Sequence, residues 1–210
     1  MNVPCSLNDD IDLLRSLRAG DEGAFVTLVR RHNRSMLLIA RSFVPNYAVA
    51  EEVVQDTWMA VVHGISKFEG RSSLKSWMIG ILVNRARSTG AREHRCMPVA
   101  SDQATVAASR FDEGAWWISP PQPFTLDVED RLSAQELLQT IRSSLDTLPA
   151  SQRQVVTLRD VEGLDSKEVC ELLEISEGNQ RILLYRARSR LRKAVESRLR
   201  KAVEADCGGL

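Results

Sequence analysis

The side chains best suited to chemistry in this chain lie close together near its C-terminal end, between residues 179 and 188. Guanidinium, amide and phenol groups there can donate hydrogen bonds to phosphates and base edges, and an aliphatic group among them can contact thymine methyls. We assign six residues to a candidate DNA-contacting surface: Asn179, Arg181, Ile182, Tyr185, Arg186 and Arg188. This is the chemistry of duplex recognition.

Two short helices separated by a turn are expected to position these side chains. Asp165, followed three residues later by Glu168, matches a capping box, so the first helix is expected to begin there. Its buried face consists of Val169, Leu172 and Leu173. Ser176 is a suitable N-cap for a second helix that starts at Glu177.

The second helix separates a buried face from an exposed one by helical spacing. Four residues share its buried side: Gln180, Leu184, Ala187 and Leu191. The six candidates therefore point elsewhere, and we interpret the pair of helices as a helix-turn-helix. Cys170 on the first helix is interpreted as a small buried hydrophobe.

The charge of the chain is neutral in total but segregated along the sequence. There are 28 basic and 28 acidic residues, yet the net charge is +8 over residues 181–201, +5 over 71–95 and −5 over 96–130. One basic run alone could equally be a solvated helix face. Two such runs, one of them on a helix-turn-helix, favour nucleic acid as a partner.

The remaining composition excludes several other classes of protein. No apolar run approaches the roughly 20 residues that span a bilayer, and the polar N-terminal residues do not form a signal peptide, so we expect a cytoplasmic protein without membrane insertion. The cysteines are scattered and no histidine lies at metal-ligand spacing with them: Cys5, Cys96, Cys170, Cys207, His32, His63 and His94. We therefore expect no metal site, disulfide or cofactor.

The first part of the chain is expected to form four helices and no strands. Helical spacing of apolar residues covers 10–17 and 20–43, resumes near Tyr47 until Gly64, and begins again at Leu74. In the third helix the residues predicted to point inward are Ala50, Val53, Val54, Thr57, Trp58, Val61 and Val62. Those left outside are Glu51, Glu52, Gln55 and Asp56.

Residues 96–130 have no period and are interpreted as a linker. They contain several prolines and the adjacent Trp116 and Trp117, which either bind a partner or dock on one of the two domains. The helical period then returns, with Pro149 at the start of one helix. We expect an all-α chain of two small helical domains, residues 10–95 and 131–203, joined by that linker.

The ordered set of segments resembles the bacterial RNA polymerase sigma factors of the extracytoplasmic-function type, over most of residues 10–201. Residues 50–58 (AEEVVQDTW) resemble the core-polymerase-binding helix of the family's region two. Residues 68–77 (FEGRSSLKSW) and 84–87 (NRAR) resemble the segment that melts and reads the promoter −10 element. Residues 148–156 (LPASQRQVV), which lead into the helix-turn-helix, resemble region four.

The resemblance implies a sigma factor that is monomeric on core RNA polymerase, contacts its clamp and flap, and is inhibited by an anti-sigma factor. The core-binding residues implied are Glu52, Val53, Gln55 and Asp56. The residues implied for capturing a flipped −10 base and holding phosphates are Phe68, Gly70, Arg71, Ser72, Ser73, Lys75, Asn84, Arg85 and Arg87. An acidic stripe beside Val53 would complement a basic clamp, although such a stripe can also be a merely solvated face. Trp77 is interpreted as a core residue and not as a stacking platform, since it lies on the apolar face of its helix.

For the −35 element, the family's contacts match Arg181, Ile182, Tyr185 and Arg186, and Glu177 and Asn179 begin the same helix. Arg181 and Arg186 are assigned to a guanine or a phosphate. The chain departs from the family pattern twice: Gln180 occupies a usually apolar core position, and Glu174 stands where glycine often makes the turn. The resemblance also implies that the acidic linker threads towards the RNA exit path, so that deleting residues 112–123 would alter promoter escape.

Two other classes of function are weaker explanations. A stand-alone helix-turn-helix repressor would dimerise on a palindrome, which leaves the whole first domain unexplained. An enzyme would need a convergent catalytic constellation, and the sequence contains no nucleophile–base pair, phosphate loop or metal set.

Overall fold

The computed structural model describes residues 7–94 and 134–207, and within these ranges the chain forms helices and no strand. The chain divides into two compact units, Met1–Val99 and Ala100–Leu210. The expected all-α architecture is confirmed. None of the helices in the described ranges is long and apolar enough to cross a membrane. The expected linker, residues 96–130 with Trp116 and Trp117, lies entirely outside the described residues.

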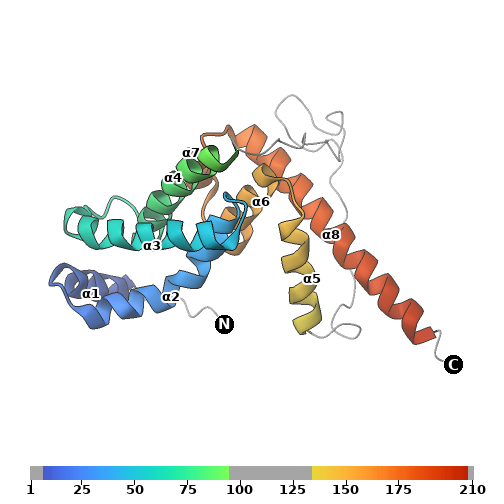
Figure 1. Ribbon diagram of the computed structural model, residues 1–210, viewed down its shortest axis with the longest axis horizontal. Coiled ribbons are helices and arrows are strands. Elements are labelled where there is room, and N and C mark those ends of the chain that lie inside the picture. The colour runs from blue at the N-terminus through green and yellow to red at the C-terminus, as the bar shows by residue number, and fades with distance from the viewer. Residues whose placement is uncertain (1–6, 95–133, 208–210) are drawn as a thin grey trace. The chain divides into compact units, whose positions relative to one another are not determined.

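The first unit contains four α-helices: α1 (Leu7–Arg18), α2 (Glu22–Arg41), α3 (Tyr47–Gly64) and α4 (Leu74–His94) (Figure 1). A short 3-10 turn, η1 (Ile65–Lys67), follows α3. Side-chain caps fix two of the helix starts: Asp21 Oδ1 accepts from Gly23 N at 2.8 Å, and Asn46 Oδ1 accepts from Val49 N at 2.8 Å. The four helices predicted for this part are therefore confirmed.

The core of the first unit lies where α3 packs against both α2 and α4. Trp58 of α3 is 8% exposed, stacks edge-on against Phe25 with ring centroids 5.9 Å apart, and donates its indole N–H to Asn33 Oδ1 at 3.1 Å. One prediction for α3 is wrong: Val62 is 47% exposed and not inward. The buried stripe of α3 is narrower than its run of valines suggested: Val61 is 1% exposed, and Val62, 100° further round the helix, lies outside the stripe.

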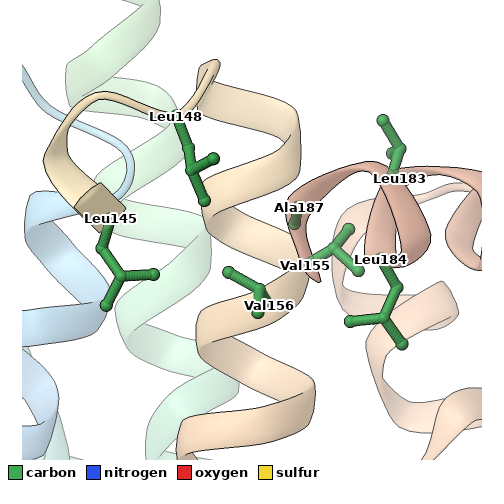
Figure 2. Packing of buried hydrophobic residues seen from close by; sticks show 7 residues of the cluster. All are labelled: Leu145, Leu148, Val155, Val156, Leu183, Leu184 and Ala187. Atoms are coloured by element: carbon green, nitrogen blue, oxygen red, sulfur yellow. The ribbon is translucent and has the colours of Figure 1, made fainter. Parts of the chain in front are cut away.

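The second unit contains α5 (Ala134–Asp146), α6 (Ala150–Val156), α7 (Ser166–Leu173) and α8 (Glu177–Cys207). A π-helical turn, η3 (Thr157–Val161), continues α6. Pro149 precedes α6 as its N-cap, and its carbonyl accepts from Arg153 N at 2.9 Å, so the prediction that it marks a helix start is confirmed. Figure 2 shows the core cluster between α5, α6 and α8, made up of Leu145, Leu148, Val155, Val156, Leu183, Leu184 and Ala187.

Candidate DNA-binding and protein-binding surfaces

The turn between α7 and α8 has the geometry that the sequence predicted for a helix-turn-helix. Asp165 Oδ1 accepts from Glu168 N at 2.8 Å, and Glu168 Oε2 accepts from Asp165 N at 3.1 Å, which completes the capping box. Glu174 ends α7 in the left-handed conformation, with φ 56° and ψ 43°. The turn thus requires the backbone shape that glycine adopts without strain, although a glutamate occupies it.

A buried polar contact fixes the start of α8. Gln180 is only 2% exposed, and its amide makes two hydrogen bonds to the first residue of α7. Ser166 Oγ donates to Gln180 Oε1 at 2.5 Å, and Gln180 Nε2 donates to the Ser166 carbonyl at 3.1 Å. The polar residue in the usually apolar position is therefore satisfied, and it ties α8 to α7.

The candidate DNA-contacting residues lie on the side of α8 that faces away from the core. Leu183, Leu184 and Ala187 are buried, as is Gln180. The exposed candidates are Glu177, Asn179 and Arg188, and the half-buried ones are Arg181, Ile182, Tyr185 and Arg186. Asn179 N donates to Ser176 Oγ at 3.2 Å, as expected for the predicted N-cap. None of these candidates is fully buried, as expected for side chains that point away from the buried face of α8, and their role as DNA contacts stays a prediction.

Arg188 is bound within the second unit by the carboxylate of a distant residue. Its Nε donates to Asp160 Oδ2 at 2.8 Å and its Nη2 donates to Asp160 Oδ1 at 2.6 Å. The hydrogen bond to Asp160 raises the pKa of the Arg188 guanidinium, whereas partial burial opposes the rise. Sequence spacing missed this pair, since the two residues are 28 positions apart.

Cys170 on α7 carries no sign of a reactive thiol. Burial raises the pKa of Cys170, and the nearby Glu177 carboxylate adds to the rise, against smaller opposing effects of Ser166 and Arg159. The raised pKa disfavours the reactive thiolate, although Cys170 is half-buried and not fully buried as expected.

The loop before α4 divides the predicted −10 residues into buried and exposed ones. Phe68 is 7% exposed and packs on Trp77 with ring centroids 5.1 Å apart, so its prediction as a nucleic-acid contact is wrong. Its ring fills the space beside the first turn of α4, and Arg18 donates to its carbonyl. Gly70, with φ 74°, and the side chains of Arg71, Ser72 and Ser73 are exposed.

Ser73 and Trp77 have structural contacts of their own. Ser73 Oγ accepts from Ser76 N at 3.0 Å, which caps the start of α4. Trp77 packs on Phe68 and closes over Gly64, where an added Cβ would come within 3.1 Å of the indole ring. The tryptophan therefore serves as a packing residue, as the sequence interpretation expected.

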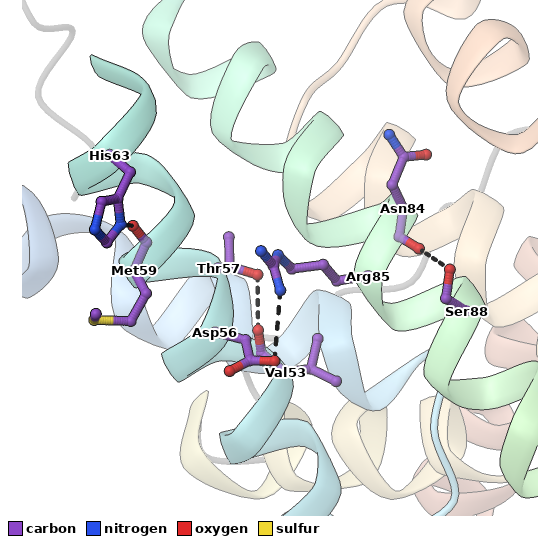
Figure 3. Close-up of polar contacts among 8 residues, drawn as sticks. All are labelled: Val53, Asp56, Thr57, Met59, His63, Asn84, Arg85 and Ser88. Carbon is purple, nitrogen blue, oxygen red and sulfur yellow. Dashed lines mark hydrogen bonds and ion pairs between the residues drawn. The ribbon is translucent and has the colours of Figure 1, made fainter. Parts of the chain in front are cut away.

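Helix α4 does not bring all of its predicted −10 residues to one side. Lys75 and Asn84 are nine positions apart, which places them on opposite sides of a helix that turns 100° per residue. Asn84 is exposed, and Arg85 and Arg87 are half-buried. Arg85 Nη1 lies 3.5 Å from Asp56 Oδ2 on α3, so a predicted −10 residue contacts a predicted core-binding residue (Figure 3).

The exposed side of α3 combines acidic and apolar groups. Glu52, Gln55 and Asp56 are exposed, as predicted, but Val53 is 3% exposed and faces the core, so its prediction as a partner contact is wrong. Val53 points inward because it shares the buried face of α3 with Thr57, whose Oγ1 donates to the Val53 carbonyl at 2.7 Å.

Two apolar residues that the sequence analysis missed extend this exposed stripe. Met59 is 59% exposed and Val62 is 47% exposed, and they follow Glu52, Gln55 and Asp56 at helical spacing. Met59 lies on the exposed side with His63, whose Nδ1 is 2.7 Å from the Met59 carbonyl oxygen (Figure 3). Met59 is three positions after Asp56, and Val62 is three positions after Met59, and this helical spacing was the signal that could have identified them.

An apolar cavity of about 540 Å³ opens beside Val62. It lies between the end of α1, the start of α2 and the end of α3, and its lining includes Leu17, Phe25, Val26, Val61 and Ile65. Val26, at its rim, is 45% exposed. The stripe on α3 thus continues into a recess that can accept an apolar side chain of a partner protein.

Comparisons with known proteins match both units. The family model described as Sigma-70 region 2 matches residues 28–95, and that described as Sigma-70, region 4 matches residues 138–191, together more than half of the chain. The ECF RNA polymerase sigma-E factor of Salmonella typhimurium is 27% identical over 190 residues, which cover 90% of this chain and 95% of that relative.

Two solved structures have a similar fold. CnrH in complex with the cytosolic domain of CnrY is 22% identical with a TM-score of 0.54, and the match covers 90% of this chain and 97% of that one. The sigma factor RpoE in complex with the anti-sigma factor NepR, from Bartonella quintana, is 23% identical with a TM-score of 0.51, covering 90% of this chain and 95% of that one.

Proposed function

The chain belongs to the sigma-70 family, as an alternative sigma factor of the extracytoplasmic-function type, and from this membership we propose how its surfaces divide the work of initiation. The first unit binds core RNA polymerase and opens the −10 element, and the second unit reads the −35 element. The observation that carries this proposal is that an acidic and apolar stripe lies on the region 2 match while a basic helix-turn-helix lies on the region 4 match.

Helix α8 is the proposed −35 reader. Its exposed side offers Arg181 and Arg186 for a guanine or a phosphate, and Ile182 and Tyr185 for thymine methyls and the backbone. Glu177 and Asn179, at the start of the helix, lie where the N-terminal residues of a recognition helix contact base edges. The high positive charge of the helix supports phosphate contacts along the groove.

The loop before α4 is the proposed −10 site. The exposed backbone around Gly70, together with Ser72, offers a small polar surface for a flipped base. Asn84, Arg85 and Arg87 offer an amide and two guanidinium groups for the displaced strand, and Arg71 and Lys75 supply further positive charge. Phe68 and Trp77 support this surface from below and do not belong to it.

The stripe on α3 is the proposed polymerase contact. Glu52, Gln55 and Asp56 supply charge complementarity to a basic clamp, and Met59 and Val62 supply the apolar area that most protein interfaces bury. The second unit makes the flap contact implied by the family. A stand-alone repressor is not favoured, because it would have no use for this face.

The regulatory partner is proposed from the solved relatives. Two proteins of similar fold are solved as complexes: CnrH with the cytosolic domain of CnrY, and the sigma factor RpoE with the anti-sigma factor NepR. We propose that an anti-sigma factor likewise inhibits this protein, and that the chain is a cytoplasmic, non-enzymatic monomer on the polymerase. Residues 10–95 and 131–203 are proposed as regions two and four, with the linker 96–130 threading towards the RNA exit path.

Run-off transcription with purified core polymerase on a promoter library tests this division. Wild type is expected to direct specific starts. Asp56→Arg is expected to weaken core binding by at least ~10-fold, as expected for reversing a charge at an interface. Asp56→Asn removes the charge without placing a second guanidinium beside Arg85. Arg181→Ala is expected to retain core binding and lose −35 selection.

The matched control for the charge reversal is Asp12→Arg on α1. Asp12 is an exposed acid with one surface ion pair, 3.0 Å from Arg15, whose loss costs little. Core binding is therefore expected to survive this change. A wild-type protein that fails to bind core polymerase yet shifts duplex DNA by itself would contradict the proposal.

A further inference from the structure

Helix α8 is anchored by polar bonds at two points, one within its buried face and one on its exposed side. The first is Gln180, bonded to Ser166 on α7, and the second is Arg188, bonded through two donors to Asp160 on the π-helical turn η3. The two anchors are eight residues apart, or about 12 Å along the helix. The candidate −35 residues Arg181, Tyr185 and Arg186 all lie between them.

Apolar packing alone leaves the rotation of a helix about its own axis weakly determined, because the hydrophobic effect has no direction. Hydrogen bonds do have direction, and a guanidinium bound through two nitrogens to both oxygens of one carboxylate also fixes the plane of the pair. Because Arg188 is seven residues after Arg181, the two side chains leave α8 on nearly the same side. The Asp160 bond therefore controls the direction in which the Arg181 side of the helix faces.

The π-helical turn accounts for the position of Asp160. In η3 the Glu162 amide donates to the Thr157 carbonyl at 3.0 Å, five residues earlier, in place of the usual four. Between η3 and α7, the Leu164 amide donates to the Leu158 carbonyl at 3.0 Å, and Arg159 donates to the Leu164 carbonyl. The backbone that carries Asp160 is thus tied on both sides, so the carboxylate is a fixed point for α8.

We propose that Arg188 is a positioning residue that acts through Asp160, and not a DNA-contacting residue as its place on the exposed side of α8 suggested. The pair fixes the rotation of α8 so that Arg181, Tyr185 and Arg186 meet the −35 base edges together. This inference rests on the proposed function, and it withdraws Arg188 from the list of direct contacts. Because Asp160 offsets its charge, Arg188 adds little to the attraction of the helix for phosphates.

The test is the binding of holoenzyme, reconstituted from core polymerase and full-length protein, to matched and mismatched −35 promoters over a range of salt. Arg188→Lys keeps the charge but cannot form the two-donor bond. If Arg188 positions the helix, Arg188→Lys, Arg188→Ala and Asp160→Ala each lower the ratio of matched to mismatched affinity by about 5-fold, the effect expected of a partly exposed pair. The slope of affinity against salt is expected to stay at its wild-type value for Arg188→Ala.

A direct contact between Arg188 and a DNA phosphate would give a different set of results. If Arg188 contacts a phosphate, Arg188→Ala reduces the salt slope by about one and weakens both promoters equally, Arg188→Lys behaves as wild type, and Asp160→Ala tightens binding. The double variant Asp160→Arg with Arg188→Asp is expected to recover most of the lost discrimination only if the pair acts as a positioning unit. Thermal unfolding of each variant identifies those that simply fail to fold.

The proposed function fails separately from this inference. A wild-type holoenzyme that does not discriminate between the two promoters contradicts −35 reading by α8. A wild type that discriminates, together with variants that discriminate equally well, contradicts the positioning role of Arg188 alone.

Discussion

Helix α3 in the first unit and helix α8 in the second both expose a charged stripe, but different interactions hold the two helices. The inner side of α3 is made up mainly of apolar residues, among them Val53, Val54 and Val61. Its polar contacts to neighbouring helices include the hydrogen bond from Trp58 to Asn33 and the exposed ion pair of Asp56 with Arg85. Helix α8 adds two directed polar anchors to its apolar contacts: the buried Gln180 binds Ser166, and the exposed Arg188 binds Asp160.

This difference fits the two kinds of partner. A protein interface tolerates small rotations of a helix, because its apolar side chains repack and its charges act at a distance. Base readout does not tolerate such rotations, since two-donor hydrogen bonds to a base edge require fixed positions of the donors. The first unit is therefore expected to depend mainly on the volume of its core, and the second mainly on its polar bonds.

The largest effect is expected from a cavity in the first unit. Leu82 of α4 is 0% exposed, and α4 packs against α3. Leu82→Ala is expected to lower the free energy of unfolding of the first unit by about 3 kcal/mol. Hydrogen exchange followed by mass spectrometry, read on peptides of α3, measures the loss, and core binding is expected to fall with it.

The control for this change is Leu138→Ala. Leu138 is also a helical leucine, but it is 52% exposed on α5 of the second unit. Its removal is expected to change the free energy of unfolding by less than about 0.5 kcal/mol. Equal losses in the two variants would mean that burial does not govern the stability of the first unit.

A smaller effect is expected from the polar anchor at the start of α8. Gln180→Ala leaves Ser166 without its two bonds and opens a small cavity, so the free energy of unfolding of the second unit is expected to fall by about 2 kcal/mol. Discrimination between −35 sequences is expected to fall as well, because α8 loses one of its fixed points. Urea unfolding and holoenzyme binding measure the two effects.

Two further variants sharpen this result. Gln139→Ala, at an exposed position of α5, is the matched control and is expected to change little. Gln180→Leu restores the apolar residue that the family usually has there, and we expect it to recover stability without recovering discrimination. Full recovery of both would mean that α8 is held by apolar packing alone, and the contrast with α3 would be lost.

The sequence predicted the helices of both units because apolar periodicity and capping residues are properties of a single segment. Asp165 with Glu168, and Ser176 with Asn179, could be read directly from spacing. The limits of the buried face of each helix could not be read from spacing in this way. Val62 is exposed, although it follows the buried Val61, because periodicity gives the direction of a stripe and not its width.

Contacts between residues that are distant in the sequence could not be predicted from spacing. Phe68 was assigned to the −10 surface, but its burial depends on Trp77 of α4. Arg188 was assigned to DNA, but its partner is 28 residues away on a π-helical turn that no local pattern indicates. Gln180 was recognised as unusual, and only the fold supplied Ser166 as its partner.

The smallest change in the free energy of unfolding is expected at the turn of the helix-turn-helix, and it is an increase, whereas the earlier variants lower this free energy. Glu174 has φ 56°, the left-handed region that costs a non-glycine residue about 1 kcal/mol. Glu174→Gly is therefore expected to raise the free energy of unfolding of the second unit by roughly 0.5–1 kcal/mol, in spite of the greater freedom of glycine in the unfolded chain. Urea unfolding measures this gain.

The matched control is Glu171→Gly, which makes the same replacement at an exposed position inside α7. There the backbone is helical, so glycine is expected to lower the free energy of unfolding by about 1 kcal/mol. Opposite signs for the two variants would attribute the effect to backbone conformation, since the chemical change is identical. A loss of stability in both would mean that the Glu174 side chain contributes more through its own contacts than its backbone strain costs. Because Glu174→Gly leaves both anchors of α8 in place, −35 discrimination is expected to remain at its wild-type value.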